Sequence, residues 1–101
     1  MSFQVDSMKK PPAIVLHAPV SDPSKLKQFV EDCLKEGVPL IAICGEGCED
    51  LEDKVDWIVI GDGTDDDRFI ATTCHRDETI EEVLEFAACW DGGSEVRQVR
   101  L

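Results

Sequence analysis

The sequence predicts an α/β fold: a single-domain, three-layer α/β/α sandwich with a mainly parallel, Rossmann-like sheet of four or five strands. Two continuous apolar runs, 13–18 and 38–44, lack polar alternation, which is typical of strands that are covered on both faces. The segment between them has apolar residues at helical spacing. Because a strand, a helix and a strand follow one another at this length, a βαβ unit of a parallel sheet is expected.

The first helix has clear start and stop signals. Ser21 and Asp22 are candidate N-cap residues, Pro23 suits the first helical position, and Gly37 suits the residue after the last turn. The apolar stripe between them consists of Leu26, Phe29, Val30, Cys33 and Leu34. This helix is therefore expected to cover the strands on either side of it.

The middle of the chain is expected to add two more strands. After a short helix within residues 45–56, the apolar run 57–60 predicts a third strand that ends at Gly61. The run 69–74 predicts a fourth strand. Residues 61–68 between them are fewer than a parallel crossover usually needs, so an antiparallel edge is an open alternative.

The last part of the domain predicts a second long helix and an edge strand. Thr79 and Glu82 have the spacing of a capping box, and the helix is expected to end near Gly92. Residues 95–101 alternate imperfectly between apolar and charged side chains, which favours an exposed edge strand. Such a strand could pair with a second copy, so the chain is expected to be a monomer or a homodimer.

The net charge of the chain limits the kinds of partner it is expected to bind. The 101 residues include 10 basic and 22 acidic side chains, a formal charge of −12, so binding to nucleic acid or to an anionic membrane is not expected. Residues 1–12 predict a flexible lead-in to a domain over residues 13–101. The apolar run after that lead-in is too short for a signal peptide, and five cysteines are an odd number, so we expect reduced thiols and a cytoplasmic location.

A ligand cleft is expected where the strands end. Ligands of open parallel sheets bind outside the carboxyl ends of the strands. The residues expected there are His17, Cys44, Gly45, Gly47 and Asp62. Cys74 and His75 would join them only if the fourth strand is parallel.

Cys44 is a candidate nucleophile because it stands where a strand turns into a glycine-bearing loop. The segment PLIAICGEG, residues 39–47, resembles the strand and turn of class I glutamine amidotransferases, in which a cysteine follows such a strand. The resemblance implies thiol-mediated hydrolysis with Cys44 as nucleophile and Glu46 or His75 as helper. On this hypothesis the catalytic residues are Cys44, His17 and Glu46, and the pKa of Cys44 must be depressed.

A second local resemblance involves the segment KVDWIVIG, residues 54–61, together with the preceding strand PLIAI. These segments are similar to the strand, short helix and strand of sugar-isomerase domains. The resemblance implies a shared α/β architecture, and we transfer no binding residue from it.

Two groups of residues could attract a metal ion. Cys44, Cys48, Cys74 and His75 are of types that bind zinc, but their spacing differs from the paired C-x2-C of structural zinc sites. The acidic loop 61–67 lacks the order of an EF-hand. No phosphate-binding glycine motif is present either, so neither a metal nor a cofactor is expected.

The second long helix carries an acidic face formed by Glu78, Glu81, Glu82 and Glu85. This face is either simply solvated or a docking surface for a basic protein. Because no catalytic, phosphate or metal motif is complete, the leading hypothesis is a non-catalytic module that binds a protein partner or a small ligand. The alternative is a small enzyme with thiol-dependent chemistry at Cys44.

Overall fold

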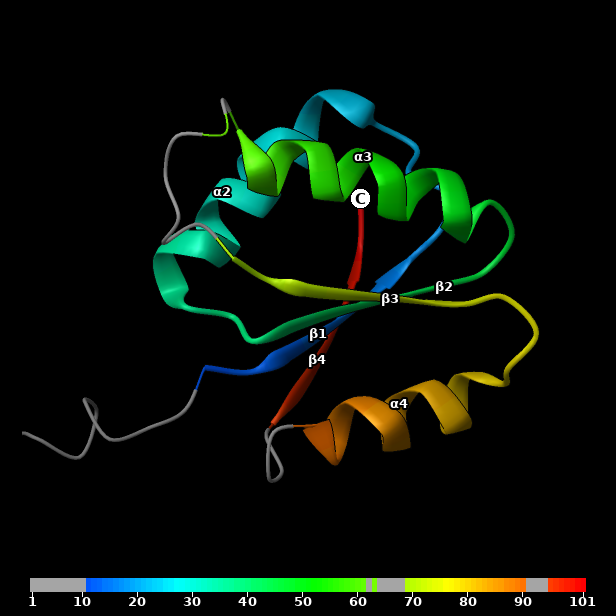
Figure 1. Cartoon of the computed structure of the whole chain (residues 1–101). Coiled ribbons are helices and arrows are strands. Elements are labelled where there is room, and N and C mark those ends of the chain that lie inside the picture. The colour runs from blue at the N-terminus through cyan, green and yellow to red at the C-terminus, as the bar shows by residue number, and fades with distance from the viewer. Residues whose placement is uncertain (1–10, 62, 64–68, 91–94) are drawn as a thin grey trace, which may run out of the picture.

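A computed structural model describes residues 11–61, 63, 69–90 and 95–101 of the chain. The elements in order are β1 (Ala13–His17), η1 (Pro23–Lys25), α2 (Leu26–Glu36), β2 (Leu40–Cys44), α3 (Cys48–Ile60), β3 (Ala71–His75), α4 (Ile80–Ala88) and β4 (Val96–Arg100). The four strands form one sheet in the order β3-β2-β1-β4, and every pairing is parallel. Helices α2 and α3 cover one face and α4 covers the other (Figure 1). The predicted α/β/α sandwich is confirmed.

The two faces of the sheet have separate apolar cores. Ile14, Leu16, Ile41 and Ile43 pack against α2 and α3, while alternate strand residues such as Val15 and Ala42 pack against α4. All five residues of β2 are buried. Because β1 and β2 are covered on both sides, their sequences are apolar without alternation, as predicted.

The predicted third strand at residues 57–60 is wrong, because these residues form the last turn of α3. Leu51, Val55 and Val59 are buried at spacings of four, which is one stripe of a helix that begins at Cys48. Trp57 is 67% exposed and Ile60 is 49% exposed. Packing of the stripe against the sheet therefore outweighs the β-propensity of the run WIVI. The likeness to the strand of sugar-isomerase domains is lost with it.

Strand β3 is parallel to β2, so the antiparallel alternative is wrong. The connection from β2 to β3 contains the whole of α3, which is long enough for a parallel crossover. The strand begins at Ala71, two residues later than predicted, and Phe69 before it is 74% exposed. Asp56 of α3 accepts a hydrogen bond of 2.7 Å from the Thr72 hydroxyl, which ties the helix to this strand.

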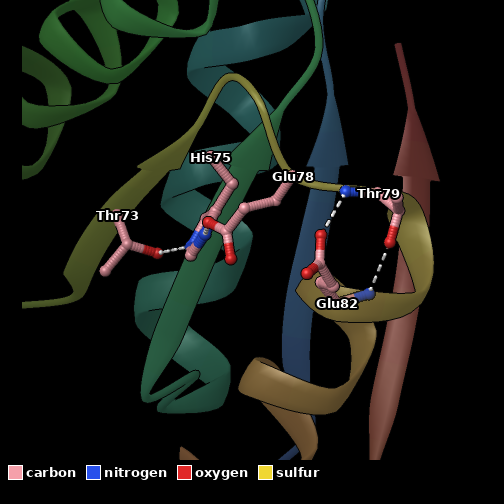
Figure 2. Close-up of polar contacts among 5 residues, drawn as sticks. All are labelled: Thr73, His75, Glu78, Thr79 and Glu82. Carbon is pink, nitrogen blue, oxygen red and sulfur yellow. Dashed lines mark hydrogen bonds and ion pairs between the residues drawn. The ribbon is translucent and has the colours of Figure 1, made fainter.

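The predicted start and end of the first helical segment and the predicted start of the second long helix agree with the structure, but α4 ends at Ala88, before the expected end near Gly92, which lies outside the described residues. Asp22 caps η1 by accepting a hydrogen bond from the backbone N–H of Ser24, and Gly37 ends α2 in the left-handed conformation with φ 77°. The capping box of α4 is complete: Thr79 accepts from the N–H of Glu82, whose carboxylate accepts from the N–H of Thr79 (Figure 2).

Strand β4 lies at one edge of the sheet, as predicted, and the structure pairs it with β1. Residues 1–10 of the predicted lead-in lie outside the described residues, and Pro11 and Pro12 precede β1 without regular structure. No helix among the described residues has the length and apolar character needed to cross a bilayer.

Candidate functional site

The parallel register places four polar or thiol side chains in one row at the carboxyl edge of the sheet. His75 of β3 is level with Cys44 of β2, Cys44 with His17 of β1, and His17 with Arg100 of β4. Residues that are level in a parallel sheet point to the same face. In this row that face is the one covered by α4, because Cys44 packs in the core beneath α4.

Cys44 and His17 are in contact within this row. The Sγ atom of Cys44 lies 3.6 Å from Nδ1 of His17, and Nε2 of His17 lies 3.0 Å from Oε1 of Gln98. Since an amide oxygen only accepts, Nε2 of His17 donates and Nδ1 is free to accept from the thiol. A thiol, an imidazole and an amide thus form a continuous hydrogen-bonded chain, in which Gln98 replaces the predicted Glu46.

The electrostatic environment of Cys44 favours its neutral form. Burial raises the pKa of the Cys44 thiol, the nearby Cys48 raises it further, and the guanidinium of Arg100 opposes them. The requirement of a depressed pKa is therefore not met by these surroundings.

The predicted ligand cleft is divided between the two faces of the sheet. Glu46 and Gly47 line a separate hollow of about 160 Å³ with Ala18, Pro19 and Leu51, on the side of α2 and α3. His17 and Cys44 face α4 instead. Gly45 lies between them, where its backbone approaches that of Ala18. Asp62 lies outside the described residues; it follows Gly61, which ends α3 and not the predicted strand.

His75 is a buried polar side chain on the α4 face. It is 6% exposed, its Nε2 lies 2.7 Å from the hydroxyl of Thr73, and its Nδ1 pairs with the carboxylate of Glu78 (Figure 2). Its ring also packs against Phe86 of α4 at a centroid distance of 4.7 Å. These contacts fix His75 at the end of β3 and Glu78 in the turn just before α4.

A shallow depression of about 470 Å³ runs along α4, and we call it the α4 groove. Its lining residues are Glu78, Glu82, Glu85, Phe86, Cys89 and Trp90. The rings of Phe86 and Trp90 lie 5.5 Å apart between centroids, so His75, Phe86 and Trp90 form a series of packed rings. Three of the four predicted acidic docking residues line this groove, whereas Glu81 does not.

A family model for a domain of unknown function (DUF7684) matches residues 3–97. The chain belongs to the DUF7684 family. No curated protein and no solved structure matches it.

The DUF7684 chain separates the four residues that were considered for zinc. Cys44 and His75 face α4, whereas Cys48 and Cys74 pack with the opposite core, where their sulfur atoms lie within 4.8 Å of each other. Burial, the neighbouring Cys48 thiol and the charges of Glu49 and Glu52 raise the pKa of Cys74 to about 12. Of the acidic loop 61–67, the described structure includes Gly61 and Gly63 alone.

Sequence reasoning missed the contributions of Gln98 and the aromatic residues to the sites of this DUF7684 domain. Gln98 lies on the edge strand, far from His17 in sequence, so only the pairing of β4 with β1 brings them together. Phe86 and Trp90 have the spacing of one helical turn, which is a recognisable signal. That signal fits core packing equally well.

Proposed function

We propose that this DUF7684 domain is a non-catalytic binding module whose α4 groove holds a basic segment of a partner protein. The observation that carries the proposal is the composition of the groove: the carboxylates of Glu78, Glu82 and Glu85 stand beside the rings of Phe86 and Trp90. A guanidinium or ammonium group is attracted both by carboxylates and by the face of an aromatic ring. The groove therefore fits an arginine or lysine side chain better than a neutral or acidic one.

The groove is organised before any partner arrives. Glu78 is held by His75, and Glu82 by the backbone N–H of Thr79. The ring series from His75 to Trp90 holds the aromatic side. Because these groups lose little freedom on binding, more of the interaction energy is available for affinity. Glu85 is exposed and makes no ion pair with any described residue, so it is free to pair with an incoming cation.

The charge of the whole chain supports the same partner class. A net charge of −12 attracts basic proteins over a distance and repels nucleic acids and anionic membranes. All five cysteines are free thiols in the structure, which supports a reducing, cytoplasmic setting as part of this proposal.

The test uses Trp90 as its own reporter. Trp57→Phe on α3 removes the other tryptophan, so that the fluorescence of this variant reports on the groove alone. We expect a synthetic arginine-rich peptide to change this fluorescence saturably and a glutamate-rich peptide of equal length to leave it unchanged. We also expect the affinity to fall as NaCl is raised from about 0.05 M to 0.5 M.

A matched pair of substitutions locates the site on α4. Glu85→Lys, in the groove, is expected to weaken binding of the peptide about tenfold, or about 1.4 kcal/mol. Glu81→Lys makes the same change of charge at an exposed position of α4 that lies outside the groove, so it is expected to weaken peptide binding much less. Equal weakening by both variants would mean that only the overall charge matters, and it would overturn the groove proposal.

A second candidate function is thiol chemistry at Cys44, which is favoured by its 3.6 Å contact with His17. Alkylation by iodoacetamide across pH distinguishes the two functions, because a catalytic thiol reacts rapidly at neutral pH. Since burial raises the pKa of Cys44, we expect it to react more slowly at pH 7 than the exposed Cys89. Faster alkylation of Cys44 than of Cys89 would favour the enzyme instead.

A further inference from the structure

We propose that Cys48, Cys74 and Glu49 form a zinc-binding site between the start of α3 and the end of β3. The two sulfur atoms and one carboxylate oxygen of Glu49 all lie within 4.8 Å of one another. In a tetrahedral site with Zn–S distances near 2.3 Å, two sulfur ligands lie about 3.8 Å apart. Side-chain movements of about 1 Å are therefore enough to place all three ligand atoms around one ion.

The ligand types select the class of metal. Two thiolates and a carboxylate suit zinc, whereas magnesium and calcium prefer sites made entirely of oxygen. Three protein ligands leave the fourth tetrahedral position for water or for an external ligand. On binding, each thiol releases one proton to solvent, so that both sulfur atoms coordinate as thiolates.

The two cysteines are held by regular elements. Cys48 is the first residue of α3 and is 0% exposed, and Cys74 is the fourth residue of β3. Their sulfur atoms lie within 4.8 Å of each other, so the two side chains already point toward the same space. Ligands fixed in this way require little reorganisation to bind an ion.

The surrounding charges favour a cation. The site has a charge of −3 when both thiols are ionised, and Glu52 adds a further negative charge nearby. With Zn²⁺ bound, the ion and its three ligands together would have a net charge of −1. Nη1 of Arg76 lies 3.3 Å from Oε2 of Glu49, so its guanidinium balances that charge and leaves the other carboxylate oxygen for the metal.

This site differs from the group of Cys44, Cys48, Cys74 and His75, whose spacing in the sequence does not match that of structural zinc sites. The alternation of β2 and β3 directs Cys44 and His75 to the α4 face, away from Cys48 and Cys74. Glu49 joins the thiols because it follows Cys48 at the start of α3. The inference is independent of the α4 groove, which lies on the opposite face of the sheet.

Cobalt(II) is the probe for the test, because cobalt bound to thiolates absorbs by sulfur-to-metal charge transfer. The reduced full-length protein is titrated with Co²⁺ and then with Zn²⁺. We expect a charge-transfer band that saturates at one equivalent and is abolished by zinc. Cys48→Ser and Cys74→Ser are each expected to weaken the band strongly, whereas Cys89→Ser on the far side of the sheet leaves it unchanged.

A variant at an exposed ligand separates loss of metal binding from loss of folding. Glu49→Gln removes a ligand charge without disturbing the core, and we expect it to weaken Co²⁺ binding about tenfold or more. The absence of a charge-transfer band in the reduced protein would overturn the proposal. So would a band that persists unchanged in both Cys48→Ser and Cys74→Ser, since the cobalt would then be held by other thiols.

Discussion

Gly45 approaches Ala18 so closely that a β-carbon on Gly45 would lie 2.6 Å from the carbonyl oxygen of Ala18. The backbone N–H of Ala18 also donates a 2.8 Å hydrogen bond to the carbonyl of Cys44. The loops that follow β1 and β2 are thus joined directly at the carboxyl edge of the sheet. This contact holds the row of His17 and Cys44 in position from the loop side.

We predict that Gly45→Ala destabilises the fold by about 2–5 kcal/mol, because it combines a clash with backbone and a φ of 98°. Gly47→Ala is the matched control. Its φ is 84°, but nothing lies within 4 Å of the added carbon, so only about 1–2 kcal/mol is expected. The free energies of unfolding in urea measure both, and equal losses would show that the contact with Ala18 is unimportant.

Loss of the capping box of α4 is expected to lower the free energy of unfolding less than Gly45→Ala does. Thr79→Ala removes the acceptor for the N–H of Glu82 and is expected to cost about 1 kcal/mol in the free energy of unfolding. Thr79→Ser keeps an acceptor at the same position and is expected to be nearly neutral. Urea denaturation followed by circular dichroism distinguishes the two variants. An equal loss in both would assign the effect to the methyl group of Thr79.

The contact between α3 and β3 can be tested by a double-mutant cycle. Thr72→Val removes the hydroxyl that donates to Asp56, and Asp56→Ala removes the acceptor. Because both residues are half-buried, we expect a coupling energy of about 1 kcal/mol. Additive effects of the two substitutions on the free energy of unfolding would show that solvent has replaced this hydrogen bond.

Alkaline pH is expected to destabilise the protein. Burial, with the charges of Glu36 and Asp32, raises the pKa of Cys33 from 9.0 to about 12. Between these values the folded state keeps a proton that the unfolded state has lost. The free energy of unfolding is therefore at its full value below pH 9 and falls as the pH rises toward 12.

The control for this pH dependence is Cys33→Ala, which removes the titrating group. Urea unfolding at intervals across the alkaline range gives the slope for each protein. We expect a shallower slope in the variant, although its stability at neutral pH is lower because a buried side chain is shortened. Identical slopes would assign the alkaline loss to other groups.

Local sequence signals determined most of the elements of this protein. The unbroken apolar runs predicted β1 and β2, Pro23 and Gly37 predicted the limits of the first helical segment, and Thr79 with Glu82 predicted the start of α4. Each of these signals depends on residues a few positions apart, so their physical effect is local. The acidic face of the second long helix could be predicted from the sequence for the same reason, because its glutamates are close together in the chain.

The third strand and the arrangement of the site residues depend on long-range packing. The run at 57–60 has the composition of a strand, and only the burial of Val55 and Val59 against the sheet makes it part of α3. That helix supplies the crossover that makes β3 parallel, and the parallel register sets His75 level with Cys44. Strand alternation then sends Cys44 and Cys74 to opposite faces. The helices, most strands and the chemistry of their side chains thus follow from local patterns, whereas the contacts among distant residues depend on register and packing, which no local pattern encodes.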